Sequence, residues 1–407
     1  MAYAGLKEGK MKILYYTSPS FLEASFHRIK ILSRLAELHV IVELPPEAHH
    51  VNIMNVPSGK RFSRLMEPWD AVANCFPPGV GAYWKDAAHI ELAVYTQKKS
   101  VHPAAWIDSF RVASRIKKIK PDLIFLEDIF LRFAWNAWRL RSIPMVAAIH
   151  DPVPHSGEKN WRKELAHRLV LSQVSHVLLM NSRLTQAFSK RCKFPRDRIS
   201  VVPLGPYAIF REWIKTPVPQ APKTVLFFGR LSKYKGIDVL YKAAPLVAEK
   251  VPGVCFVIAG RPVPGYEPPV VPDLPNNGRI DVLDRYIDNE EMADLFQRAR
   301  VVACPYIDAT QSGVLFTAYG FDRPVVCTAV GGLPEYMRDG ETGLLVPPYD
   351  SRALADALNR ILTNDWAQRD RGEGETESTP RIMNWDEIGD KMMTLFHRAI
   401  SSRQENV

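Results

Sequence analysis

The chain has 407 residues, of which 46% are hydrophobic and 24% are charged, as in ordinary folded proteins. This length exceeds what one hydrophobic core usually holds, so we expect two domains. No stretch approaches the length of a membrane span, and residues 1–10 lack the apolar segment of a signal peptide, which predicts a cytoplasmic protein. The five cysteines stand singly without metal-ligand spacing, so we expect small core residues in a reducing compartment.

The net charge of +9 is distributed unevenly along the chain. Residues 1–205 carry 30 Lys and Arg against 17 Asp and Glu, whereas residues 206–407 carry 23 against 27. A basic first half indicates an anionic partner, and nucleic acid, phospholipid or an anionic substrate would each fit. Because no recognisable binding module accompanies the charge, nucleic acid is the least favoured of the three.

Strands and helices are predicted to alternate along the first half, which is the pattern of βαβ units and a parallel sheet. The turn after the first strand has hydroxyl residues but no Gly-x-Gly-x-x-Gly, so a dinucleotide site of the oxidoreductase type is not supported. We expect strands at 13–16, 39–44, 123–126, 145–149 and 176–180, and helices at 26–38, 104–120 and 161–174.

The expected helix 104–120 places Trp106 and Phe110 at helical spacing with Ala113 and Ile116, and basic residues crowd its C-terminal half. One interpretation is a core-facing helix with a solvated basic face, since cations suit the C-terminal end of a helix dipole. The other is a peripheral membrane-contact helix, in which aromatic and basic residues act together. We weigh the first above the second.

The strand 145–149 delivers His150 to its carboxyl end, and Pro152 and Pro154 then favour an extended loop. Ligands of open parallel sheets bind beyond the carboxyl ends of the strands. A histidine there can bind a substrate hydroxyl or take up a proton, although a structural role fits a lone strand-end histidine as well.

The second half begins with a proline-rich segment, 216–222, that we interpret as an interdomain linker. An apolar run at 225–228 predicts a buried strand that turns on Gly229 and is followed by Arg230, Lys235 and an amphipathic helix to about residue 251. Two fixed cations beside flexible backbone can bind a diphosphate. Taken alone, this stretch fits a surface turn with solvated cations equally well.

Alternation continues after this turn. Ser312-Gly313 is predicted to open a helix to about Phe321, and the free backbone N–H groups of such a helix start favour anions. Asp288 is the expected N-cap of the preceding helix, with Glu291 three positions on. Further strands are expected at 254–260, 280–283, 301–304 and 324–328, and a mobile surface segment at 369–380.

These motifs in this order resemble the retaining glycosyltransferases of family 4, most densely from residue 201 to 362. The segment 228–236, Phe-Gly-Arg-Leu through Lys-Gly, is similar to that family's diphosphate-binding motif. Residues 331–335 and 339–348 match its C-terminal signature, and 384–388 resembles the start of a final helix that crosses back to the first domain.

The resemblance implies an α/β architecture of the GT-B type, with two Rossmann-like doubly wound domains facing a central cleft. Residues 1–205, completed by the helix 384–403, would form the acceptor-side domain. Residues 206–383 would form the domain that binds the nucleotide sugar.

The same resemblance implies that Arg230 and Lys235 neutralise the donor diphosphate and that His150 lies near the transferred sugar. The family usually has two glutamates at positions that are Ala309 and Thr317 here. Asp308 can substitute for the first if the loop shifts, and Thr317 offers a weaker hydrogen bond than a carboxylate. The donor contacts implied are Gly229, Gly260, Arg261, Tyr286, Ile287, Asp308, Gln311, Ser312, Gly313, Val314 and Thr317.

The expected activity is transfer of a hexose from a nucleotide-diphosphate sugar, with uridine as the base, to a saccharide or lipid-linked acceptor. By the same resemblance, configuration would be retained and neither cofactor nor metal is expected. The sequence agrees about the metal, since it has no Asp-x-Asp pair. The reaction would serve polysaccharide or glycoconjugate assembly, and the basic first half predicts peripheral contact with an anionic membrane. Two alternatives are a nucleotide-sugar epimerase on the same fold and a non-catalytic relative that binds nucleotide or saccharide.

Overall fold

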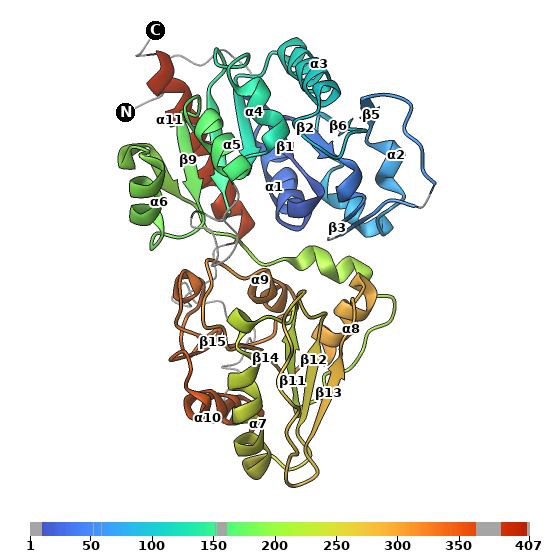
Figure 1. Ribbon diagram of the computed structural model, residues 1–407, viewed down its shortest axis with the longest axis vertical. Coiled ribbons are helices and arrows are strands. Elements are labelled where there is room, and N and C mark those ends of the chain that lie inside the picture. Colours follow the sequence, from blue (N-terminus) through green and yellow to red (C-terminus); the bar gives the residue numbers. More distant parts are fainter. Residues whose placement is uncertain are drawn as a thin grey trace. The chain divides into compact units, whose positions relative to one another are not determined.

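The computed structural model describes residues 10–51, 53–57, 59–150, 152, 161–363 and 384–404. The chain forms two compact units, Met1–Leu204 with Trp385–Val407, and Gly205–Asn384 (Figure 1). The boundary lies one residue before the expected domain limit. The predicted surface segment 369–380, most of the lead-in 1–10 and most of the loop after His150 lie outside the described residues.

The first unit is built on an eight-stranded sheet in the order β10-β9-β8-β7-β1-β2-β6-β5, in which only β5 runs antiparallel to its neighbour. Its strands are β1 (Lys12–Thr17), β2 (Glu37–Leu44), β5 (Met66–Pro68), β6 (His89–Val94), β7 (Leu123–Glu127), β8 (Met145–Ile149), β9 (His176–Leu179) and β10 (Ile199–Val201). A separate antiparallel pair is formed by β3 (His50–Val51) and β4 (Met54–Asn55).

Helices cover both faces of this sheet. One face is packed by α3, α4, α5 and α6 in a continuous apolar core, and α1 and α11 lie side by side against the other (Figure 1). The helices are α1 (Leu22–Leu35), α2 (Asp70–Ala73), α3 (Pro103–Ile119), α4 (Leu131–Ala137), α5 (Trp161–Leu171), α6 (Thr185–Cys192) and α11 (Trp385–Gln404).

Two details of the predicted first helix and of α3 are wrong. The predicted helix 26–38 ends at Leu35, because the Glu37 N–H donates to the Met11 carbonyl and Glu37 enters β2. On α3 the core-facing residues are Ala105, Val112 and Ile116, whereas Trp106 and Phe110 are more than a third exposed. Of the expected stripe, Ala113 and Ile116 are therefore buried as predicted, whereas Trp106 and Phe110 are not.

The second unit has a six-stranded parallel sheet in the order β13-β12-β11-β14-β15-β16. Helices α7 and α10 pack on one face, and α8 and α9 contact β11 and β14 on the other. The elements are β11 (Thr224–Phe228), α7 (Ile237–Lys250), β12 (Cys255–Ala259), β13 (Arg279–Leu283), α8 (Asn289–Arg298), β14 (Val301–Cys304), α9 (Gly313–Gly320), β15 (Val325–Thr328), β16 (Gly343–Val346) and α10 (Ser351–Leu362).

Each sheet has one point at which the strand order reverses, which is where doubly wound folds bind ligands. In the first unit the reversal lies between β1 and β7, and in the second it lies between β11 and β14. Three of the five cysteines, Cys255, Cys304 and Cys327, are buried thiols on strands of the second sheet. Within the described residues, no helix is long and apolar enough to cross a membrane.

The docking of α11 on the first unit predicts a large stability effect from one residue. Phe396 is fully buried and its ring lies 5.3 Å from that of Phe125 on β7. We expect Phe396→Ala to lower the free energy of unfolding by about 3–5 kcal/mol, the cost of the lost burial plus the cavity. Urea denaturation measures this, with Lys391→Ala on the exposed side of α11 as the control. Equal stability of both variants would contradict the docking.

Candidate active site

The carboxyl edge of the first sheet holds His150 directly after β8. The side chain is 5% exposed, its ring stacks on Phe21 with centroids 4.4 Å apart, and its Nε2 lies 2.6 Å from the Glu127 carboxylate. Phe21 follows β1 and Glu127 ends β7, so the loops at the reversal point of this sheet hold the imidazole in place.

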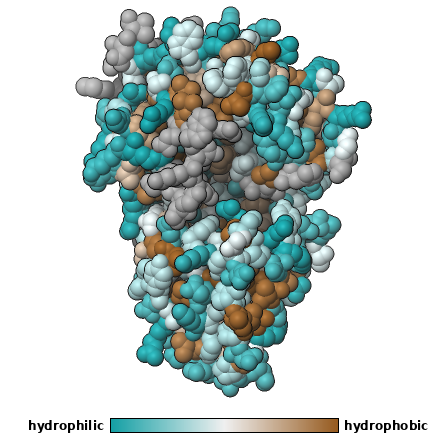
Figure 2. Space-filling view, viewed as in Figure 1, coloured by the Kyte–Doolittle hydropathy of each residue, from teal (hydrophilic) through white to brown (hydrophobic). Residues whose placement is uncertain are grey.

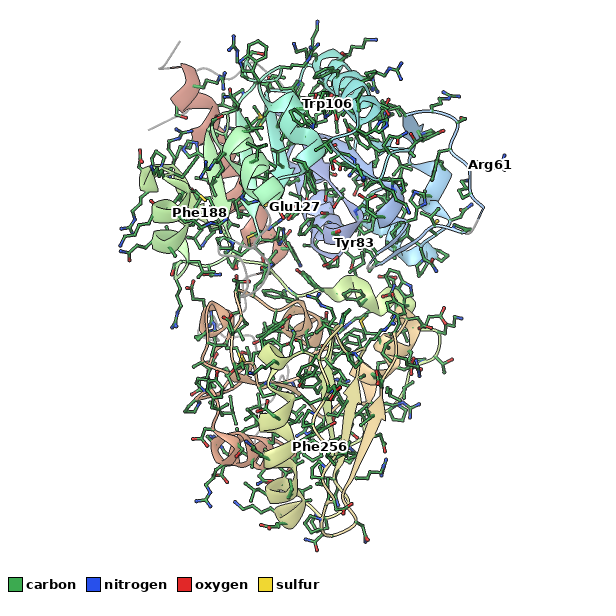
Figure 3. The ribbon with its side chains drawn as sticks, viewed as in Figure 1. Arg61, Tyr83, Trp106, Glu127, Phe188 and Phe256 are labelled. Carbon is green, nitrogen blue, oxygen red and sulfur yellow. The ribbon has the colours of Figure 1, made fainter. Side chains whose placement is uncertain are left out.

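Glu127, labelled in Figure 3, is fully buried at this edge and is the centre of a polar cluster. Its carboxylate also accepts hydrogen bonds from the Tyr15 hydroxyl and the Arg28 guanidinium. Burial by itself would raise the pKa of Glu127, but Arg28, His150 and Tyr15 outweigh burial and lower that pKa to about 2. The group is therefore an ionised hydrogen-bond acceptor at neutral pH.

An ionised carboxylate accepts only, so the His150 Nε2 must carry the hydrogen that it shares with Glu127. This contact therefore selects the tautomer and the ring orientation of His150. Glu127 is not among the site residues predicted from the sequence, although an acidic residue that ends an apolar strand beside a second strand followed by His150 is a recognisable signal.

The carboxyl edge of the second sheet brings together the loops that follow β11, β12 and β14. Gly229 donates its N–H to the Ala259 carbonyl at 2.9 Å, and a Cβ on Gly260 would lie 2.0 Å from the Gly229 oxygen. Only glycine fits at Gly260, whose φ is +145°. The Leu231 N–H then donates to the Arg261 carbonyl at 2.9 Å, so the basic turns after β11 and β12 are adjacent.

Lys235 is the most distinctive residue of this edge. Its ammonium nitrogen lies 3.8 Å from the centre of the Tyr306 ring, which follows β14, and the side chain is partly buried. Burial lowers the pKa of Lys235 to about 8, with the neighbouring Arg230 acting in the same direction. Among the described residues no carboxylate forms an ion pair with Lys235. A partly desolvated cation without an anionic partner is a group that an anionic ligand would stabilise.

The backbone positions Lys235 tightly. Gly236 has a φ of +69°, and a Cβ there would lie 1.9 Å from the Pro305 oxygen, so this close contact with the loop after β14 also requires glycine. The Ile307 N–H donates to the Tyr234 carbonyl at 2.8 Å, which joins the same two loops.

The start of α9 extends the site. The Ser312 hydroxyl caps the helix by accepting from the Leu315 N–H at 3.4 Å, and it lies 3.2 Å from the Tyr306 hydroxyl. Gly313 is exposed at the first turn. Tyr306 therefore links Lys235 to a helix N-terminus, and both favour negative charge.

The structure also shows where the other predicted contacts lie. Ala309 and Thr317 are buried, and the Thr317 hydroxyl donates to the Gly313 carbonyl at 2.9 Å within α9. Because the hydroxyl proton is used inside the helix, Thr317 could only accept a hydrogen bond from the nucleotide sugar. Asp308 is exposed. The other predicted residues with exposed side chains are Arg230, Arg261 and Tyr286. Gln311 and Val314 are partly exposed, and Ile287 is buried.

Sequence comparisons assign both units to known families. The family described as "Glycosyl transferases group 1" matches residues 222–364, and the "Glycosyl transferase 4-like domain" matches residues 38–205. A D-inositol 3-phosphate glycosyltransferase of Corynebacterium glutamicum is 30% identical over 66% of this chain and 70% of that protein. Relatives of the same name in two other Corynebacterium species match over about half of their own length.

Solved structures agree in fold. The Anabaena protein Alr3699/HepE, solved with UDP and glucose, has a TM-score of 0.58 and 16% identity, with 98% of this chain and all of that chain covered. The catalytic domain of starch synthase IV from Arabidopsis thaliana, bound to ADP and acarbose, has a TM-score of 0.60 and 12% identity, with 96% and 100% covered. At these identities the likeness shows the two-domain GT-B fold.

The Glu127 cluster predicts a pH-dependent stability difference. Replacing Glu127 with Gln leaves Arg28 buried without its countercharge, so we expect Glu127→Gln to cost about 3 kcal/mol of unfolding free energy at neutral pH. The folded pKa of about 2 lies below the ordinary 4.5. The carboxylate therefore stabilises the fold above that ordinary value, and this contribution is lost as the pH falls toward 2.

Urea denaturation at a series of pH values measures the difference in unfolding free energy between the native protein and Glu127→Gln, which we call the gap. The gap should be constant above pH ~5 and should shrink at lower pH. The exposed control Glu249→Gln should differ little from the native protein at every pH. A gap that does not change down to pH ~3 would refute the ion cluster.

Proposed function

The chain belongs to the group 1 glycosyl transferases of family 4, and from this premise we propose its reaction. It moves a hexose from a nucleotide-diphosphate sugar to a saccharide or lipid-linked acceptor, with retention of anomeric configuration. The observation that supports this most is the partly buried Lys235 ammonium, held against Tyr306 without a carboxylate partner among the described residues. It stands at the strand-order reversal of the second sheet, where a diphosphate is expected.

In the proposed reaction, cleavage of the bond between sugar and diphosphate places growing negative charge on the leaving group. Arg230, Lys235 and the first turn of α9 would stabilise that charge, and they are organised before the donor arrives. Burial of Lys235 against Tyr306 strengthens its attraction for phosphate, because the local dielectric is lower than that of water. These groups make a protein-bound metal unnecessary for neutralising the diphosphate.

We assign to His150 the binding of a sugar hydroxyl, or stabilisation of the developing positive charge through its backbone carbonyl. Glu127 would act as a positioning residue, since it sets the tautomer and orientation of the ring.

We further propose that the acceptor is anionic. The relatives named above are called D-inositol 3-phosphate glycosyltransferases, and a phosphorylated or lipid-linked acceptor suits the basic first half of this chain. UDP-sugars are the first donors to test. We propose that the reaction takes place in the cytoplasm at the membrane surface, and that it serves glycoconjugate or polysaccharide assembly.

The turnover experiment offers UDP-, GDP- and ADP-sugars with a panel of acceptors that includes inositol 3-phosphate, in the presence of EDTA. We expect release of nucleoside diphosphate together with a glycosylated acceptor. Arg230→Ala and Lys235→Ala should each lower turnover by roughly 100-fold, the scale of losing one preorganised charge partner. Lys242→Ala, an exposed cation of α7, is the matched control.

Near-native turnover in either site variant would contradict the assignment. An isomerised sugar without transfer would indicate an epimerase. Nucleotide binding without either product would indicate a non-catalytic relative.

The lowered pKa of Lys235 predicts how nucleotide affinity depends on pH. Only the ammonium form attracts the diphosphate, so UDP affinity should fall as the pH rises through about 8. The fall should approach tenfold per pH unit. Calorimetry between about pH 7 and pH 9 measures this. Lys235→Met should bind weakly at every pH, whereas Arg230→Ala should bind weakly but keep the pH dependence. The same pH dependence in Lys235→Met would exclude Lys235 as its source.

A further inference from the structure

Helices α3, α4 and α5 pack side by side on one face of the first sheet, and their outward side is unusually apolar. Twelve large hydrophobic residues are exposed in the described chain, and seven of them come from this layer and its connections. We call this surface the basic–aromatic face. Its apolar members are Val101, Trp106, Ile107, Phe110, Trp138, Leu165 and Leu169.

Cations are interleaved with these side chains. Arg139 lies 4.8 Å from the centre of the Phe110 ring, and Arg141 lies 4.5 Å from that of Trp138. Residues 98–141 contain ten Lys and Arg against four Asp and Glu, of which Arg132 and Glu127 are buried. On α3, Arg111 is paired with Asp108 and Arg115 with Glu91. Lys117 and Lys118 are exposed and form no ion pair among the described residues. Hydrophilic and hydrophobic residues also alternate on the visible side of this unit (Figure 2).

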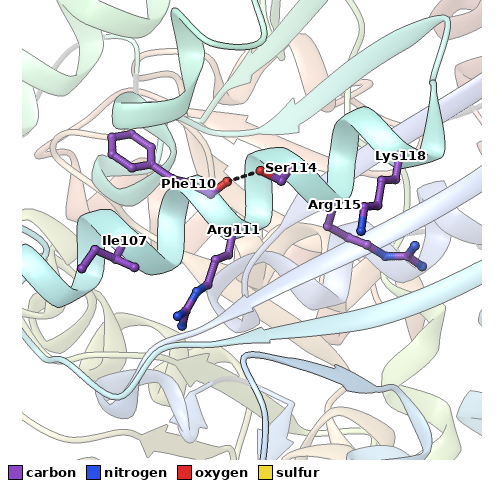
Figure 4. Close-up of a pocket in the computed structure, with 6 residues that line it drawn as sticks. All are labelled: Ile107, Phe110, Arg111, Ser114, Arg115 and Lys118. Atoms are coloured by element: carbon purple, nitrogen blue, oxygen red, sulfur yellow. Dashed lines mark hydrogen bonds between the residues drawn. The ribbon is translucent and has the colours of Figure 1, made fainter.

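A shallow groove of about 430 Å³ runs along α3 within this face. In Figure 4, Ile107, Arg111, Arg115 and Lys118 project from the same edge of the helix, as their spacing of one turn requires. Phe110 and Ser114 complete the lining. None of these residues belongs to the predicted donor site, so the groove needs an explanation of its own.

We propose that the basic–aromatic face binds the surface of an anionic lipid bilayer, with headgroup phosphates in the α3 groove. Trp and other amphipathic side chains favour the membrane interface, and each Lys or Arg near an anionic surface adds attraction. The helices would lie in the plane of the interface with their exposed apolar side chains inserted below the headgroups. This inference does not depend on sugar transfer.

Two other occupants fit less well. Nucleic-acid sites are polar and positively charged, whereas Ile107 and Leu165 expose aliphatic surface that phosphates do not cover well. A second copy of this chain would bring two faces of the same positive sign together, which is unfavourable. A bilayer supplies both an apolar interior and negative charge.

Flotation with vesicles of phosphatidylcholine, alone or mixed equally with phosphatidylglycerol, tests the proposal. The native chain should float with the anionic vesicles only, and added salt should release it. Arg111→Gln with Lys118→Gln should lower the partition coefficient by roughly 20- to 30-fold, since each cation contributes about fivefold. Ile107→Ser with Trp138→Ser should also lower it, without changing the salt dependence.

Matched control variants distinguish the contribution of this surface to vesicle binding from effects of net charge and of exposed apolar residues elsewhere. Lys242→Gln with Arg352→Gln removes two exposed cations of the other unit, and Val270→Ser with Val271→Ser removes two of its exposed apolar side chains. Both controls should float like the native chain, and all variants should have native circular dichroism, because the changed residues are exposed. Equal binding to neutral vesicles, equal losses in the controls, or binding to RNA but not to vesicles would overturn the proposal.

Discussion

Backbone contacts that only glycine permits hold the candidate donor site together. At Gly260 and Gly236 the chain passes so close to carbonyl oxygens of neighbouring loops that a Cβ would lie 2.0 Å or less from them. These contacts bring the turn after β11 against the loops that follow β12 and β14. The backbone positions of Arg230, Lys235 and Tyr306 therefore follow from these contacts, and the Lys235 ammonium is held against the Tyr306 ring before any ligand binds.

The two units differ in whether a buried or partly buried charge has a partner of opposite charge. In the first unit, Glu127 is surrounded by Arg28, Tyr15 and His150, which satisfy it inside the fold and keep it ionised. In the second unit, Lys235 loses solvent without gaining a carboxylate among the described residues, and its pKa falls accordingly. A satisfied charge orients its neighbours, whereas an unsatisfied one attracts a ligand of opposite sign. The absence of carboxylates at Ala309 and Thr317 leaves the cations as the main charged groups of this edge.

Sequence patterns predicted ten strands of the two sheets, because parallel strands buried on both faces are apolar runs bounded by turns. They did not predict the strands β5, β6, β10 and β16. The predictions were wrong where tertiary contacts determine the end of an element or the side of a helix that is buried. Glu37 lies in a strand because β1 pairs with it, although the sequence around it continues a helical pattern. Trp106 and Phe110 share a helical stripe with Ala113 and Ile116, yet of these four residues Ala113 and Ile116 alone are buried, beside Val112. The exposed side of α3 and the partners of Glu127 depend on which helices and strands become neighbours, which the periodicity of a segment does not show.

The account rests on a diphosphate site made by backbone packing and two cations at the reversal point of the second sheet. The most direct measurement is a crystal structure of this chain with UDP. The account predicts that the diphosphate oxygens lie within hydrogen-bond distance of the Lys235 ammonium and the Arg230 guanidinium, beside the first turn of α9. A diphosphate that contacts neither cation, or that lies away from the carboxyl edge of the second sheet, would contradict it.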